Sequence, residues 1–255
     1  MSGAGERATW TRLARLAPVR AAARWAAGLG AGIEAFALSQ RCPSCGAGAD
    51  PRQLLCDECR AQIPPLSTAL CLRCLAGGRE PAGCIVHPDH VAWAAWVYEE
   101  RAALVIHALK YHDRPGLARA LAAPLARALP GGADAAAARF DLVVAIPLHR
   151  ARRRERGYNQ AEELAASLAD RIGVPALPGA LERPRPTRPQ ARLGPRERRA
   201  NLAGAFNAPR PSWLTGRRVL IVDDVLTTGA TLEACCDAVC TAGGHPTAVA
   251  LAWAQ

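Results

Sequence analysis

Val219-Leu-Ile-Val-Asp-Asp-Val-Leu-Thr-Thr-Gly-Ala-Thr231 is the stretch of this 255-residue chain that decides its fold. Residues 219–222 form a continuous apolar run, which is typical of a parallel strand covered on both faces. Two acids, Asp223 and Asp224, follow the run, and ligands of open α/β sheets bind at the carboxyl ends of strands. The stretch therefore predicts a buried strand that carries two carboxylates to a ligand site.

The residues after the acid pair predict an anion-binding loop. This candidate loop comprises Val225, Leu226, Thr227, Thr228, Gly229, Ala230 and Thr231. Its threonines offer hydroxyl donors, and its glycine lets the backbone approach an anion closely. A helical pattern follows from Leu232, so the unpaired N–H groups of a helix start would point back at the loop. An ordinary strand-to-helix turn is the alternative for Thr-Thr-Gly alone, but the whole ordered string favours a phosphate site.

In this order, the apolar run, the acid pair and the Thr/Gly loop resemble the fingerprint of type I phosphoribosyltransferases, which bind 5-phosphoribosyl-1-pyrophosphate. The resemblance implies an α/β fold with a mostly parallel sheet flanked by helices. It implies that Asp223 and Asp224 face the ribose hydroxyls and, through water, Mg²⁺, while residues 227–231 hold the 5′-phosphate. Turnover does not follow from it, because a fold and a ligand site can be kept while the chemistry is lost.

Seven of the ten cysteines lie in the first third of the chain. They occur in pairs of candidate ligands, and two residues separate the members of each pair. The first set is Cys42, Cys45, Cys56 and Cys59, and the second is Cys71, Cys74, Cys84 and His87. Such spacing lets both ligands of a tight turn reach one tetrahedral ion, so the pattern predicts one or two structural Zn²⁺ sites. A plain loop around His87 is the alternative for the second set. Disulfides are less expected, because no convincing secretion signal occurs and the phosphate site favours a cytoplasmic, reduced protein.

The composition predicts three parts. Residues 1–41 are rich in arginine and predict a basic amphipathic segment, which either packs on its own protein or touches a membrane surface or an acidic partner. Residues 42–90 would form a small double zinc-ribbon module, and residues 91–255 the α/β domain. No apolar run is long enough for a membrane span, so integral membrane association is not expected.

The charge of the chain points to phosphate ligands. Its net charge is +10, and arginines gather between residues 150 and 199. They suit pyrophosphate or a nucleic-acid backbone, and a solvated basic face is the alternative. Lys110 is the only lysine among 32 cationic residues. We expect this compact charge either to contact pyrophosphate or the acceptor, or to cap a helix end.

A second buried strand is predicted at residues 140–146, followed by a helix at 157–172. The residues between them include Pro147, Leu148, His149 and Arg150, a second loop at the carboxyl edge of the sheet. The resemblance to type I phosphoribosyltransferases implies that this loop binds pyrophosphate. Asn159 and Gln160, at the start of the helix, either cap it or face a ligand.

Residues 183–206 predict a mobile lid. Its polar candidates are Gln190, Arg196, Arg199 and Asn201. A lid that excludes water would protect the cationic ribose through which phosphoribosyl chemistry passes. A surface insertion is the alternative reading of this composition.

Taken as an ordered set, these motifs resemble the ComF family of bacterial proteins. The set comprises the cysteine module, Leu109-Lys-Tyr111, Ile146-Pro-Leu-His149, Arg154-Glu-Arg-Gly-Tyr-Asn-Gln160, the lid and the acid-pair string. ComF-like proteins are associated with natural competence, the uptake of single-stranded DNA. The resemblance implies binding of phosphoribosyl pyrophosphate with Mg²⁺ and phosphoribosyl transfer to an unknown acceptor. The alternative is a non-catalytic component that handles single-stranded DNA and docks other DNA-uptake proteins.

Overall fold

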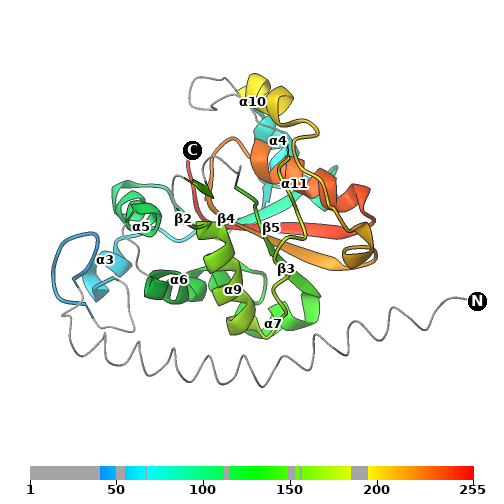
Figure 1. Cartoon of the computed structure of the whole chain (residues 1–255). Helices are drawn as coiled ribbons and strands as arrows, with labels where there is room; N and C mark the ends of the chain where they lie inside the picture. Colours follow the sequence, from blue (N-terminus) through cyan, green and yellow to red (C-terminus); the bar gives the residue numbers. More distant parts are fainter. Residues whose placement is uncertain are drawn as a thin grey trace, which may run out of the picture.

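A mixed five-stranded sheet organises the described part of the chain (Figure 1). The computed structural model describes residues 41–49, 55–66, 68–111, 115–148, 153–154, 157–184 and 195–255. The strands are β1 (Leu70–Cys71), β2 (Val91–Val97), β3 (Leu142–Ala145), β4 (Arg218–Leu226) and β5 (His245–Trp253), in the order β1-β2-β5-β4-β3. Only β1 is antiparallel to its neighbour; the other pairs are parallel. The predicted α/β class with a mostly parallel sheet is confirmed.

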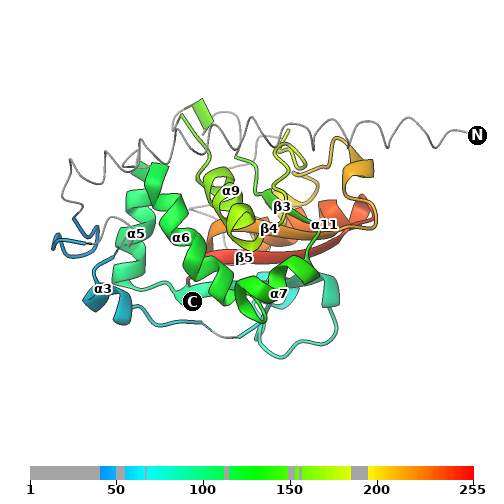
Figure 2. The ribbon, with the colours of Figure 1, turned by 90° about the horizontal axis from the view of Figure 1, so that it is seen from below.

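Helices cover both faces of the sheet. They are α3 (Asp57–Ala61), α4 (Leu72–Ala76), α5 (Glu100–Tyr111), α6 (Pro115–Ala128), α7 (Gly132–Arg139), α9 (Gln160–Ile172), α10 (Pro195–Leu202) and α11 (Ala230–Thr241), with short 3-10 turns η1 (Pro88–His90) and η3 (Pro211–Trp213). Figures 1 and 2 show α6 and α9 on one face of the sheet and α11 on the other. Two hydrophobic cores result, one on each face.

β4 is the central strand of the site, and it is longer than the sequence pattern predicted. The apolar run at residues 219–222 is fully buried, as expected. Pairing with β5 then continues beyond the run, because Asp223 lies opposite Ala250 and Leu226 opposite Trp253. Both acids therefore belong to the strand. The bends come at residues 227–229, and α11 begins at Ala230.

The cysteine-rich segment is joined to the sheet through β1. The backbone of Leu70 and Cys71 pairs with residues 91–92 at the start of β2. The helix that follows, α4, is amphipathic in its packing, and Leu72 and Ala76 are completely buried in the core beside α11. The second cysteine cluster is therefore held against the same sheet face as α11. Among the described residues, no helix is both long enough and apolar enough to cross a membrane.

Candidate phosphoribosyl site

The acid pair and the only lysine of the chain meet at the carboxyl end of β4. Lys110 lies in the last turn of α5, and its Nζ is 3.0 Å from Oδ2 of Asp224. Both side chains are largely buried, with exposed fractions of 23% and 15%. An ion pair shielded from water to this degree is stronger than a surface pair. Tyr158 stabilises the end of α5, because its hydroxyl donates a hydrogen bond to the carbonyl of Leu109.

Asp223 lies on the same strand but faces the other side of the sheet. Adjacent residues of a strand point to opposite faces, so Asp224 meets α5 while Asp223 is directed toward α11. Its Oδ1 accepts a 2.7 Å hydrogen bond from the backbone N–H of Asp224. Burial, and then the negative charge of Asp224, raise the pKa of Asp223 to about 8, against the opposing effects of that hydrogen bond and of Lys110. Ionisation of Asp223 beside the charged Asp224 is therefore unfavourable.

The candidate phosphate loop ends at Gly229, which is the N-cap of α11. Its φ of 75° lies in the left-handed region that favours glycine. In the described part of the chain, no side chain caps this helix start. The first N–H groups of α11 are therefore available to an anion, and the helix dipole favours negative charge there. Thr227 is exposed, and Thr228 and Thr231 are partly exposed around this helix start.

α4 of the cysteine-rich segment packs directly behind this loop. A Cβ placed on Gly229 would lie 3.3 Å from the carbonyl oxygen of Leu72 and 3.3 Å from Cδ2 of Leu75. Two independent constraints therefore favour glycine at this position: the left-handed backbone conformation and the close approach of α4. The sequence pattern gave no sign of this contact, because it joins residues more than 150 positions apart.

A charged cluster joins α4 to α11 beside that contact. Nη2 of Arg73 lies 2.7 Å from Oδ1 of Asp237, and Nε2 of His90 lies 2.9 Å from the same oxygen. Nε of Arg73 is also 4.0 Å from the carboxylate of Glu233, which is only 2% exposed. The His90 and Arg73 hydrogen bonds lower the pKa of Asp237, although burial acts in the opposite direction. Asp237 therefore remains an anion that ties α11 to the cysteine-rich segment.

The second predicted loop is described in part. Pro147 and Leu148 follow β3, whereas His149 and Arg150 lie outside the described residues. Buried Asn159 holds the far end of the loop, because its Nδ2 donates to the carbonyl of Ile146 at 2.9 Å and its Oδ1 accepts from the N–H of Ala161. Asn159 is therefore the N-cap of α9. Gln160 is 2% exposed, and its amide nitrogen has no hydrogen-bond partner among the described residues.

Backbone pairing joins the two ends of the predicted lid segment. Glu182 and Asn207 exchange two hydrogen bonds of 2.9 and 3.0 Å, and the guanidinium of Arg183 lies over the ring of Phe206. Between them, α10 packs against α11 and α4. Gln190 lies outside the described residues, as do the side chains of Arg196 and Arg199, whereas Asn201 is partly exposed on α10. Lid motion stays a prediction.

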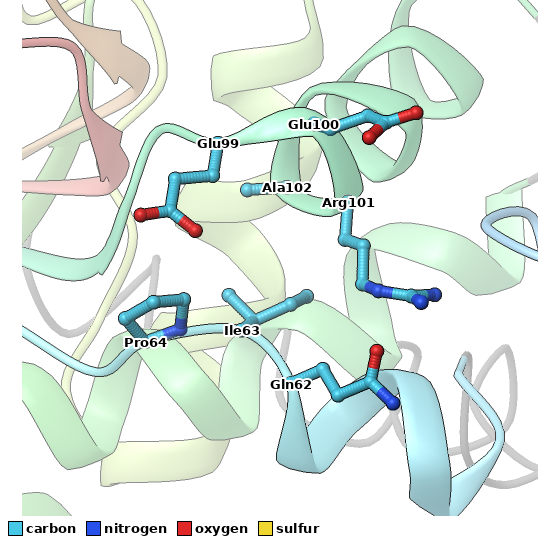
Figure 3. Close-up of a pocket in the computed structure, with 7 residues that line it drawn as sticks. All are labelled: Gln62, Ile63, Pro64, Glu99, Glu100, Arg101 and Ala102. Atoms are coloured by element: carbon cyan, nitrogen blue, oxygen red, sulfur yellow. The ribbon is translucent and has the colours of Figure 1, made fainter.

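The first cysteine set forms a compact four-sulfur cluster. The Sγ atoms of Cys42, Cys45, Cys56 and Cys59 all lie within 4.8 Å of one another, a spacing that suits a tetrahedral metal ion. Nη1 of Arg101 donates a hydrogen bond to Sγ of Cys59 at 2.9 Å from outside the cluster. Figure 3 shows Arg101 reaching from the start of α5 toward α3, beside a pocket of about 150 Å³.

The second set forms a three-sulfur, one-nitrogen cluster. Nδ1 of His87 lies 3.4, 3.9 and 3.5 Å from the Sγ atoms of Cys71, Cys74 and Cys84. A hydrogen bond from the backbone N–H of Val86 is the main effect that lowers the pKa of Cys84 to about 6. All four ligand atoms lie within 4.8 Å of one another. The structure thus brings together both predicted ligand sets, and each suits zinc by number, chemistry and spacing.

Residues 108–254 match the model of the phosphoribosyl transferase domain family. The chain is 31% identical over 206 residues to the DNA utilization protein YhgH of Salmonella typhi, covering 78% of each sequence. It is 38% identical over 94 residues to Competence protein F of Haemophilus influenzae, covering 36% of this chain and 41% of that protein. The chain belongs to the phosphoribosyl transferase domain family and, within it, to the ComF family.

A solved structure to which part of the chain is similar is the glutamine phosphoribosylpyrophosphate amidotransferase of B. subtilis. The likeness covers 56% of this chain and 30% of that chain, with 19% sequence identity and a TM-score of 0.36.

Proposed function

We propose that this protein binds 5-phosphoribosyl-1-pyrophosphate at the end of β4 and transfers its phosphoribosyl group to an acceptor, in the service of DNA utilization. One observation carries the proposal. The Asp223–Asp224 pair lies on β4 directly before the uncapped start of α11, and Lys110 is already paired with Asp224. Carboxylates for a sugar, amides for a phosphate and a cation for a leaving group are thus gathered at one strand end. The names of the YhgH and Competence F relatives support the link to DNA.

Each group has a distinct part in the proposal. The carboxyl groups of Asp223 and Asp224 form hydrogen bonds with the ribose 2′- and 3′-hydroxyls, and the N–H groups of residues 228–231 hold the 5′-phosphate. Lys110 neutralises the acid pair before the ligand arrives and faces the pyrophosphate afterwards. The loop at residues 147–150 holds the pyrophosphate from the neighbouring strand end.

The reaction is a substitution at the anomeric carbon C1. The bond from C1 to the pyrophosphate oxygen breaks with its electron pair, a lone pair of the acceptor forms the new bond to C1, and the acceptor then loses a proton. Positive charges around the pyrophosphate stabilise the charge that develops on it. The lid at residues 183–206 would exclude water, which otherwise competes as an acceptor.

Metal ions complete the proposal. Carboxylate oxygens such as those of Asp223 and Asp224 suit Mg²⁺, which prefers oxygen ligands and keeps several of its waters. When bound, Mg²⁺ would neutralise part of the pyrophosphate charge. Zinc in the two cysteine clusters would have a structural role, and the module that it stabilises offers a docking surface for other DNA-uptake proteins.

Calorimetric titration with phosphoribosyl pyrophosphate and Mg²⁺ tests the ligand. We expect the wild type to bind and Asp224→Asn to bind at least about tenfold more weakly, since a charge-assisted hydrogen bond contributes about 1.5–3 kcal/mol. Asp170→Asn is the matched control, because this exposed acid of α9 lies outside the site. Absence of binding heat from the wild type, or equal affinity of both variants, would refute the proposal. Pyrophosphate release in a screen of bases and DNA ends would then identify the acceptor.

A further inference from the structure

A cavity of about 590 Å³ opens on the face of the sheet opposite α11. It is lined by residues of α3, of β2 and of the last turn of α6. Its walls include Trp93, Trp96, Arg60, Arg127, Pro124 and Pro130. Pockets of about 300–1,000 Å³ accommodate small organic ligands. The size therefore suits one nucleotide.

The charged groups of this cavity are all cations. No acidic residue of the described chain lines it. Arg60 contacts Asp57, but this pair lies on the surface of α3, with both side chains at least half exposed, where water screens it. Burial, and then the positive charges of Arg171 and Arg60, lower the pKa of Arg127. The repulsion at Arg127 would be relieved by an anion in the cavity.

Two tryptophans of β2 form much of the apolar wall of the cavity. Trp93 is partly exposed and packs against the core, and its backbone lies in the middle of β2, opposite Val249 of β5. Trp96 is 8% exposed and adds a second ring from the same strand. An indole fixed in this way offers a surface on which a base can stack without loss of side-chain freedom. Stacking of a base on an aromatic side chain is tolerant of sequence.

We propose that the cavity between α3, β2 and α6 binds one nucleotide of a single-stranded nucleic acid, with the base against Trp93 and the backbone phosphate on Arg127 and Arg60. A planar apolar wall next to paired cations matches the two halves of a nucleotide. A proline-rich peptide would fit the walls but offers no phosphate to Arg127 and Arg60. The site is separate from the acid pair, because the described residues that line the cavity include neither the Asp223–Asp224 pair, nor Lys110, nor the phosphate loop.

The test is titration of the full-length protein with a fluorescently labelled thymidine oligonucleotide at several salt concentrations. We expect Trp93→Leu to weaken binding about tenfold, since one stacked base contributes about 1–3 kcal/mol. Arg127→Gln should weaken binding and lower the slope of log affinity against log salt by about one. Arg119→Gln is the matched control: Arg119 is also exposed on α6 and does not line the cavity, and the charge change is the same.

The remaining arms separate this site from others. Phosphoribosyl pyrophosphate with Mg²⁺ should not displace the oligonucleotide, whatever the outcome of the calorimetric test of the acid pair. Thermal unfolding of each variant confirms that the fold is intact, and Trp93→Phe, which keeps an aromatic ring, should retain most of the affinity. Equal losses in Arg127→Gln and Arg119→Gln would show a non-specific basic face. Undiminished binding by Trp93→Leu, displacement by phosphoribosyl pyrophosphate, or preference for a proline-rich peptide over the oligonucleotide would overturn the proposal.

Discussion

Arg73 of α4 and Asp237 of α11 form a 2.7 Å ion pair that joins the second cysteine cluster to the helix whose start forms the candidate phosphate site. The Arg73 side chain is only 36% exposed, and its Nε also lies 4.0 Å from the carboxylate of buried Glu233. Replacing Arg73 with Met would therefore leave two carboxylates without this cation.

We predict that Arg73→Met lowers the free energy of unfolding by about 2 kcal/mol, less than the value for a fully buried pair because Asp237 is half exposed. Urea denaturation at neutral pH measures the loss. Arg79→Met is the control, because Arg79 is an exposed residue just after α4. If both variants are equally stable, the ion pair contributes nothing to the docking of α4.

Gly229→Ala tests the close contact between the phosphate loop and α4. An L side chain at its positive φ costs about 1–2 kcal/mol, and the new Cβ would also crowd Leu72 and Leu75. Gly179→Ala is the matched control, because Gly179 has a φ of 72° but an open surrounding. We expect Gly229→Ala to lose more stability than Gly179→Ala and, unlike it, to bind phosphoribosyl pyrophosphate more weakly. Equal behaviour in both assays would show that α4 does not restrict the loop.

Metal content tests the two clusters directly. We expect about two zinc ions per chain by elemental analysis, and about one after His87→Ala, because a structural site needs all four ligands. Cys240→Ser is the control, since this half-buried cysteine of α11 belongs to neither cluster. His87→Ala should also weaken phosphoribosyl pyrophosphate binding, because Cys74 of this cluster lies on α4, Cys71 is the N-cap of that helix, and α4 touches Gly229. Two retained zinc ions would remove His87 from the ligand set.

The raised pKa of Asp223 predicts how stability depends on pH. An ordinary aspartate releases its proton near pH 4, whereas Asp223 in the folded chain holds it up to about pH 8. Between these values the native state binds more protons than the unfolded state, so this group makes stability fall as pH rises. Asp223→Asn removes the effect, and we expect it to unfold at higher urea concentrations than the wild type at pH 8, but not at pH 4. Parallel pH profiles of the two proteins would contradict the burial of this carboxyl.

The local features of the site could be predicted from the sequence, because each is a short ordered pattern. The apolar run before Asp223 and the paired ligand spacings depend on neighbours in the chain, and the structure places the strand and brings both ligand sets together. The apolar run predicts that the strand ends at Val222, whereas β4 continues to Leu226 because its pairing with β5 continues that far. The sequence distinguishes Lys110 as the one lysine and places it near a helix end, but its position beside Asp224 depends on the packing of α5 against the sheet.

Contacts between distant segments were not predictable in this way. Nothing in the spacing of Leu72 or Arg73 indicates that α4 packs behind Gly229 and pairs with Asp237. The cavity beside Trp93 has the same origin, because α3, β2 and α6 each supply part of its wall. Such contacts depend on the arrangement of whole elements, which amphipathic periodicity does not specify.

The pairing of β1 with β2 has a consequence for any shortened form of this protein. A chain that begins at Val91 would keep the parallel strands but lose the two-residue strand that pairs with Ala92 and Val91. The exposed edge of β2 would present unpaired amide and carbonyl groups. The core residues that α4 covers would become an exposed apolar patch. Sheet rims of this kind associate with one another. Residues 91–255 expressed alone should therefore self-associate rather than behave as a well-formed monomer.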